Sequence, residues 1–157
     1  IPGIKEALAK HDKKGTKTVW VTGHSLGGAM AVLVAEALTN EGIPVKELRT
    51  YGQPRVGNRL FRQHLEGCDI GAYIRYVNNN DVVPKVPPTW LLFVHGGKLM
   101  YINHYGKIRV STFWQRVKDQ FRGIWAAAKM FKFFDFVADH GMPHYIEKAG
   151  VIAKDDK

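Results

Sequence analysis

The chain has 157 residues, of which 45% are hydrophobic and 24% charged, a composition that suits one globular domain and excludes a disordered or fibrous protein. A single cysteine, Cys68, excludes an intrachain disulfide. The net charge of +9 comes from lysines and arginines that are spread along the chain without a nucleic-acid motif, so we expect no nucleic-acid partner.

The first half of the chain alternates segments typical of helices and strands. Helical spacing in residues 4–11 precedes a short strand-like run, TVWVTG, at residues 18–23. An apolar, alanine-rich segment then runs from Ser25 to Gly42, as a buried helix with a C-terminal stop does. The next segments predict a strand, a short helix and a third strand: 46–54, 58–66 and 72–79. This alternation predicts an α/β fold with a mostly parallel sheet covered by helices.

The second half is less regular. Residues 91–97 and 98–112 predict paired strands joined by a hairpin-like turn at Gly96 and Gly97, so we expect the sheet to end antiparallel. Residues 113–137 predict a helical stretch with many aromatic side chains, most of them core and some lining an acyl pocket or touching a membrane. Residues 139–150 predict a turn and a short closing helix.

The segment Gly23-His24-Ser25-Leu26-Gly27 matches the pattern G-x-S-x-G, and it lies between a predicted buried strand and a predicted apolar helix. This context is typical of a nucleophile elbow, in which a serine occupies a strained, exposed turn. We expect a Cβ atom at Gly23 or Gly27 to collide with neighbouring backbone. The helix that follows would direct the N–H of Leu26 toward an oxyanion.

A serine nucleophile needs a histidine base and an acid that orients the base, and on this fold the acid precedes the histidine in the chain. The acidic candidates after the serine are Asp69, Asp81, Asp119, Asp135 and Asp139. We favour Asp81 because it directly follows a predicted strand, where catalytic groups collect. Asp119 and Asp135 lie in the helical stretch and fit solvated helix charges better.

Four histidines follow the favoured acid: His95, His104, His140 and His144. His95 and His104 lie in or beside predicted strands, where an ordinary hydrogen-bonded role fits better. We favour His140, in a turn before the last helix, and position alone leaves His144 as a rival.

Four segments stand out along the chain, in this order: VTGHSLGGAMA, YGQPRVGN, YVNNNDVVPKVPP and DHGMPHYIEKAG. Together they resemble the class 3 lipase family, from about residue 18 to about residue 150. The resemblance implies an α/β-hydrolase fold, here a three-layer sandwich with helices on both faces. It also implies that Asp81, in an N-D-x-V-P segment, is the acid. It favours His140, which follows an aspartate and has Tyr145 a few residues on, over His144.

The resemblance further implies N-terminal strands, a lid helix and a Ser or Thr that completes the oxyanion hole. Only 24 residues precede Ser25, and none takes that position. We therefore expect residues 1–157 to form one α/β-hydrolase domain that is the C-terminal part of a longer catalytic domain. Compartment and oligomeric state stay open.

The predicted function is hydrolysis of lipid carboxylic esters, such as triacylglycerol, through a Ser25–His140–Asp81 triad and an acyl-enzyme, with the N–H of Leu26 at the oxyanion. We expect neither a metal nor an organic cofactor. The expected partners are a lipid ester substrate and a lipid–water interface or membrane surface. The alternatives are a phospholipase or acyltransferase with the same triad, or a non-catalytic membrane-binding module that uses residues 114–132.

Overall fold

The computed structural model describes residues 1–12, 18–78, 81–102, 108–109, 140–143 and 145–147. The helices and strands with defined bounds occur in the order α1 (Pro2–His11), β1 (Val19–His24), α2 (Ser25–Asn40), β2 (Val45–Tyr51), α3 (Arg59–Glu66), β3 (Tyr73–Asn78), β4 (Lys98–Ile102) and β5 (Ile108–Arg109). Two short 3-10 helices, η1 (Val83–Lys85) and η2 (Thr89–Leu91), lie between β3 and β4. Residues 142–143 and 145–147 are also helical.

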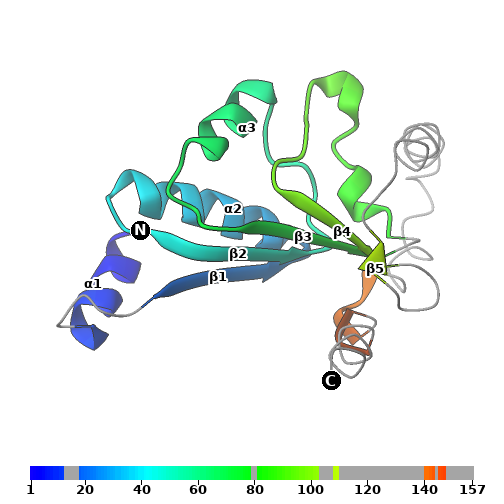
Figure 1. Ribbon diagram of the computed structural model, residues 1–157. Helices are drawn as coiled ribbons and strands as arrows, with labels where there is room; N and C mark the ends of the chain where they lie inside the picture. Colours follow the sequence, from blue (N-terminus) through cyan, green and yellow to red (C-terminus); the bar gives the residue numbers. More distant parts are fainter. Residues whose placement is uncertain (13–17, 79–80, 103–107, 110–139, 144, 148–157) are drawn as a thin grey trace.

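The strands form one sheet in the order β1-β2-β3-β4-β5 (Figure 1). The pairings from β1 to β4 are parallel, and β5 pairs antiparallel with β4. The α/β class, the mostly parallel sheet and its antiparallel end are therefore confirmed. Because the carboxyl ends of parallel strands meet at one edge of a sheet, the residues that follow β1, β2 and β3 are brought close together there.

The core lies between the sheet and α2. Buried side chains of α2, namely Ala31, Val32, Ala35 and Leu38, pack with Val45 and Leu48 of β2 and Leu65 of α3. In Figure 1, α2 and α3 lie on the same side of the sheet. Alternation along β1 turns Val19 and Val21 toward this core and leaves Trp20 and Thr22 exposed. The small side chains of α2 let the helix approach β1 and β2 closely, which fixes where its first turn lies.

The hairpin predicted between residues 91–97 and 98–112 is wrong in its first strand. Thr89–Leu91 forms η2, and Leu92 follows with a left-handed φ of 64°. Val94 makes only an isolated bridge to Gly57, and its N–H donates to the Gly57 carbonyl at 2.8 Å. Continuous apolar runs do not distinguish a strand from other structure by periodicity, and here the backbone of the run turns back instead of extending. The antiparallel pair is β4 with β5.

Several predicted features lie outside the described residues. These are the aromatic stretch 113–137, the candidate acids Asp119, Asp135 and Asp139, and the histidines His104 and His144. Within the part that the structure describes, no helix has the length and apolar character needed to cross a membrane.

Candidate functional site

The strand-to-helix turn at Ser25 has the geometry that the G-x-S-x-G pattern predicts. β1 ends at His24 and α2 begins at the next residue, so no loop separates them. Ser25 has a φ of 57°, a left-handed conformation that is rare for a residue with a side chain. Such strain persists where the surrounding fold imposes it and is characteristic of functional turns. Leu26, the next residue, is 69% exposed in the first turn of α2, where backbone N–H groups have no intrahelical acceptor.

One of the two glycines of the pattern is required by close packing. A Cβ atom at Gly23 would lie 2.8 Å from the nitrogen of Gly28 and closer still to the carbonyl group of Gly27. The expected collision at Gly27 is wrong: a Cβ atom there would meet nothing within 4 Å. Gly27 lies on the exposed side of the first turn, whereas Gly23 faces that turn from the strand. Gly28 is tight instead, because its Cβ would lie 3.1 Å from the Gly23 carbonyl oxygen.

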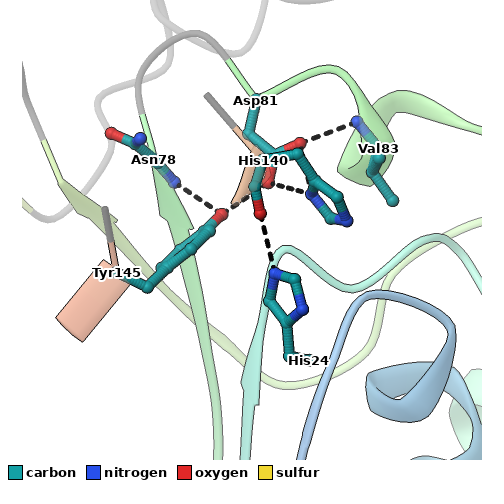
Figure 2. A network of polar contacts seen from close by, with 6 residues as sticks. All are labelled: His24, Asn78, Asp81, Val83, His140 and Tyr145. Carbon is teal, nitrogen blue, oxygen red and sulfur yellow. Dashed lines mark hydrogen bonds and ion pairs between the residues drawn. The ribbon is translucent and has the colours of Figure 1, made fainter. Parts of the chain in front are cut away.

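Asp81 lies just beyond β3, and its carboxylate is fully buried. The backbone N–H of Val83 donates to Oδ1 at 2.9 Å, and the hydroxyl of Tyr145 donates to Oδ2 at 2.6 Å. Nδ1 of His140 lies 3.0 Å from Oδ1 and 2.9 Å from Oδ2 (Figure 2). Three donors therefore surround one buried carboxylate, and both of its oxygens have hydrogen-bond partners.

This arrangement determines the tautomer of His140. A carboxylate only accepts hydrogen bonds, so Nδ1 of His140 carries a proton, and in the neutral ring Nε2 is then the nitrogen with the lone pair. Nε2 is buried and has no hydrogen-bond partner among the described residues. A neutral imidazole with a free Nε2 lone pair, oriented by a buried carboxylate, is the form that a general base requires.

Tyr145 supports the carboxylate from the closing helical segment. Its side chain is 1% exposed, and its hydroxyl accepts a hydrogen bond from the backbone N–H of Asn78 at 3.1 Å. Burial and the neighbouring Asp81 raise the pKa of Tyr145, so the hydroxyl stays a donor. The sequence pattern included this tyrosine without indicating a role for it.

Gly52, the residue after β2, also lies against Asp81 and His140, and the sequence did not indicate this contact. It has a φ of 58°, and a Cβ atom there would lie 2.6 Å from Oδ2 of Asp81 and 2.9 Å from Cε1 of His140. Because Gly52 has no side chain, the backbone of the segment YGQP can lie directly against Asp81 and His140.

Arg55 holds the loop that follows the acid. Its guanidinium donates to the carbonyl oxygens of Lys85 and Pro87, the second at 2.7 Å. The backbone N–H of Arg55 donates to the Val86 carbonyl at 2.8 Å. The loop 82–88 is thereby fixed against the segment after β2.

The remaining candidates that the structure describes lie elsewhere. Asp69 is exposed in the turn before β3. His95 contacts the loop after the acid, where its Nε2 donates to the carbonyl of Pro84 at 2.7 Å. Among the described residues no cluster of three or more His, Cys, Asp or Glu side chains could hold a metal ion.

His95 gives a prediction for stability. Burial lowers the pKa of His95 well below its ordinary value, with a smaller contribution from Arg75. Below about pH 6.5 the unfolded chain binds a proton at this residue that the folded chain does not, so the free energy of unfolding falls as pH decreases, by up to about 1.4 kcal/mol per pH unit. His95→Gln keeps a donor for Pro84 and should flatten this dependence in urea titrations between pH 7.5 and pH 5. An unchanged slope in the variant would exclude His95 as the cause.

Comparison with known proteins agrees with this geometry. The family model described as lipase (class 3) matches residues 2–90. The chain is 43% identical over 111 residues to a triacylglycerol lipase of Nicotiana tabacum, covering 64% of this chain and 19% of the relative. It is also 43% identical over 99 residues to a chloroplastic phospholipase A1 of Arabidopsis thaliana, covering 56% of this chain and 18% of the relative.

A solved triacylglycerol lipase, described as having a serine protease triad at its catalytic centre, superposes with a TM-score of 0.57 at 38% identity. The match covers 63% of this chain and 38% of the solved chain. The chain thus spans well under half the length of these relatives. The residues that the family model matches include β1, β2, β3, the elbow and the loop with the buried acid.

Proposed function

The chain belongs to the class 3 lipase family, and from that premise we propose that it carries the catalytic triad of a serine hydrolase that cleaves carboxylic esters of lipids. The proposed nucleophile is Ser25, the base His140 and the acid Asp81. The observation that supports this most is the contact of Nδ1 of His140 with the buried carboxylate, together with an Nε2 that has no hydrogen-bond partner among the described residues. Ser25 belongs to the same edge of the sheet, directly after β1.

In the proposed reaction Nε2 of His140 takes the proton of the Ser25 hydroxyl while Oγ bonds to the ester carbonyl carbon. The carbonyl electron pair moves to oxygen, and the N–H of Leu26 is the proposed donor to that oxyanion. The intermediate collapses, the bond to the alcohol breaks, and His140 returns its proton to the departing alkoxide. Water then attacks the acyl-enzyme with the same assistance, which releases the fatty acid and restores the serine.

Labelling with an alkyl fluorophosphonate tests this proposal, because such a reagent phosphonylates only an activated serine. We expect one phosphonyl group per chain, located at Ser25 by peptide mass spectrometry, and loss of p-nitrophenyl ester hydrolysis in proportion to labelling. Chain unfolded in urea is the control and should not react. Labelling at another residue, or hydrolysis that continues in fully labelled protein, would exclude Ser25 as the nucleophile. Vesicle binding without any labelling would favour a non-catalytic membrane-binding module.

A phospholipase is the second candidate, favoured by the similarity to the phospholipase A1 of Arabidopsis thaliana. The triad serves both reactions, so headgroup preference decides between them. We propose that the substrate is taken from a lipid surface in either case, which the consecutive exposed apolar side chains Trp90, Leu91 and Leu92 support. Release of fatty acid from triolein emulsions and from phosphatidylcholine vesicles, measured side by side, separates the two activities.

A further inference from the structure

His24 occupies the variable position before Ser25, to which the G-x-S-x-G pattern assigns no role. In the structure it contacts the base directly. Nε2 of His24 lies 2.8 Å from the backbone carbonyl oxygen of His140 (Figure 2). The two imidazole rings are also stacked, with centroids 4.6 Å apart and planes inclined by 27°.

These contacts connect two segments that are far apart in the chain. A carbonyl oxygen accepts hydrogen bonds, so Nε2 of His24 carries the proton and donates it. The ring of Tyr145 also lies beside His24 in an edge-to-face arrangement, at a centroid distance of 5.7 Å. One side of the base is thus held by the strand that ends at the elbow, and the other by the carboxylate of Asp81.

Building on the proposed triad, we infer that His24 is a positioning residue that sets the distance between nucleophile and base. His24 and Ser25 are consecutive, so their Cα atoms are about 3.8 Å apart whatever the rest of the chain does. A hydrogen bond from His24 to the backbone of His140 therefore fixes the base relative to the serine next in the chain. The stacked ring also restricts rotation of the His140 imidazole away from the serine.

This role has a stringent geometric requirement. Reacting atoms must be held about 3–3.5 Å apart for efficient transfer, and a displacement of about 1 Å costs about 10²-fold in rate. Asp81 controls the orientation of the His140 ring through Nδ1, but it lies after β3 and does not connect the ring to β1. His24 makes that connection directly.

The test separates the two contacts by substitution. His24→Phe keeps a flat ring for stacking and removes the donor, His24→Gln keeps a donor near Nε2 and removes the ring, and His24→Ala removes both. We expect the rate constant of Ser25 labelling by the fluorophosphonate, and kcat for p-nitrophenyl esters, to fall about tenfold in His24→Phe and about 10²-fold in His24→Ala. His24→Gln should stay within about threefold of the wild type, and KM should change little in all three.

A second readout does not depend on turnover. The proton shared between Nδ1 of His140 and Asp81 should give a far-downfield proton NMR signal in the wild type and in His24→Gln. This signal should broaden or disappear in His24→Phe and His24→Ala, because an unanchored imidazole exchanges its proton with water. His11→Phe, at an exposed histidine of α1, is the matched control and should alter neither the signal nor the rate.

The outcomes distinguish the two proposals. If wild-type Ser25 is labelled and His24→Phe and His24→Ala retain its labelling rate and NMR signal, the role of His24 is wrong and the triad stands. If the wild type shows the downfield signal but no labelling at Ser25, the proposed function is wrong. If His24→Ala fails to fold, the comparison of His24→Phe with His24→Gln decides. A labelling rate that falls in His24→Phe and falls equally in His24→Gln would also contradict positioning by the hydrogen bond.

Discussion

Asp81→Asn is expected to lower kcat by about 10⁴-fold while leaving the fold in place. The substitution keeps the shape of the side chain but replaces one acceptor oxygen by an NH₂ group. The native carboxylate accepts from Val83, Tyr145 and His140 at once. An amide has one oxygen for three donors, so at least one donor loses its acceptor.

The tautomer of His140 explains most of the expected loss. With the amide oxygen toward the Val83 N–H, the NH₂ group faces Nδ1 of His140 and donates to it, which moves the imidazole proton to Nε2. That nitrogen then cannot accept the proton of Ser25. Tyr145 is left with a hydroxyl proton that has no acceptor in a buried site, which costs about 1–3 kcal/mol of the free energy of unfolding.

Kinetics of p-nitrophenyl ester hydrolysis and urea unfolding measure the two effects separately. Asp69→Asn makes the same chemical change at an exposed aspartate and is the control. It should change the free energy of unfolding by no more than about 0.5 kcal/mol, and kcat by no more than the factor that corresponds to this energy. A variant Asp81→Asn with more than a tenth of wild-type kcat would show that another carboxylate orients the base.

The sequence predicted the parts of the fold and site that depend on local pattern. The strand before Ser25, the helix after it and the strand before Asp81 each follow from apolar spacing and turn residues, and they lie within a few residues of β1, α2 and β3. Parallel pairing then placed the ends of these strands at one edge. Position alone left His140 and His144 unresolved, and the resemblance favoured His140, which the structure brings to Asp81.

The contacts that the sequence did not predict are those between residues that lie far apart in the chain. His24 occupies a position that any residue can take in the pattern, and its partner lies 116 positions away. Tyr145 reaches both Asp81 and the backbone of Asn78 across the end of β3. The strand predicted at residues 91–97 is wrong because the apolar residues of the run LLFVH follow neither a strand-like nor a helix-like period. Leu91 and Leu92 are exposed and do not belong to a strand.

Gly52→Ala is the second large expected effect, and it acts on the site without removing any chemical group. The added methyl would lie 2.6 Å from Oδ2 of Asp81, 2.9 Å from Cε1 and 3.0 Å from Nδ1 of His140. The first two distances are shorter than real Cβ contacts and the third is unusually tight. Both side chains are held by other hydrogen bonds, so the imidazole must shift. We expect kcat to fall by about 10²-fold or more, since a displacement of about 1 Å suffices.

Gly42→Ala isolates the contact from the backbone effect. Gly42 also has a left-handed φ, 75°, but a Cβ atom there would meet nothing within 4 Å. Both alanine variants should therefore lose about 1–2 kcal/mol of the free energy of unfolding through backbone strain, and only Gly52→Ala should also lose activity and the downfield signal of the His140–Asp81 proton. Equal activity in the two variants would mean that the acid–base pair can move without affecting catalysis, which contradicts the requirement for a fixed base on which the proposed roles of Asp81, His24 and Gly52 all depend.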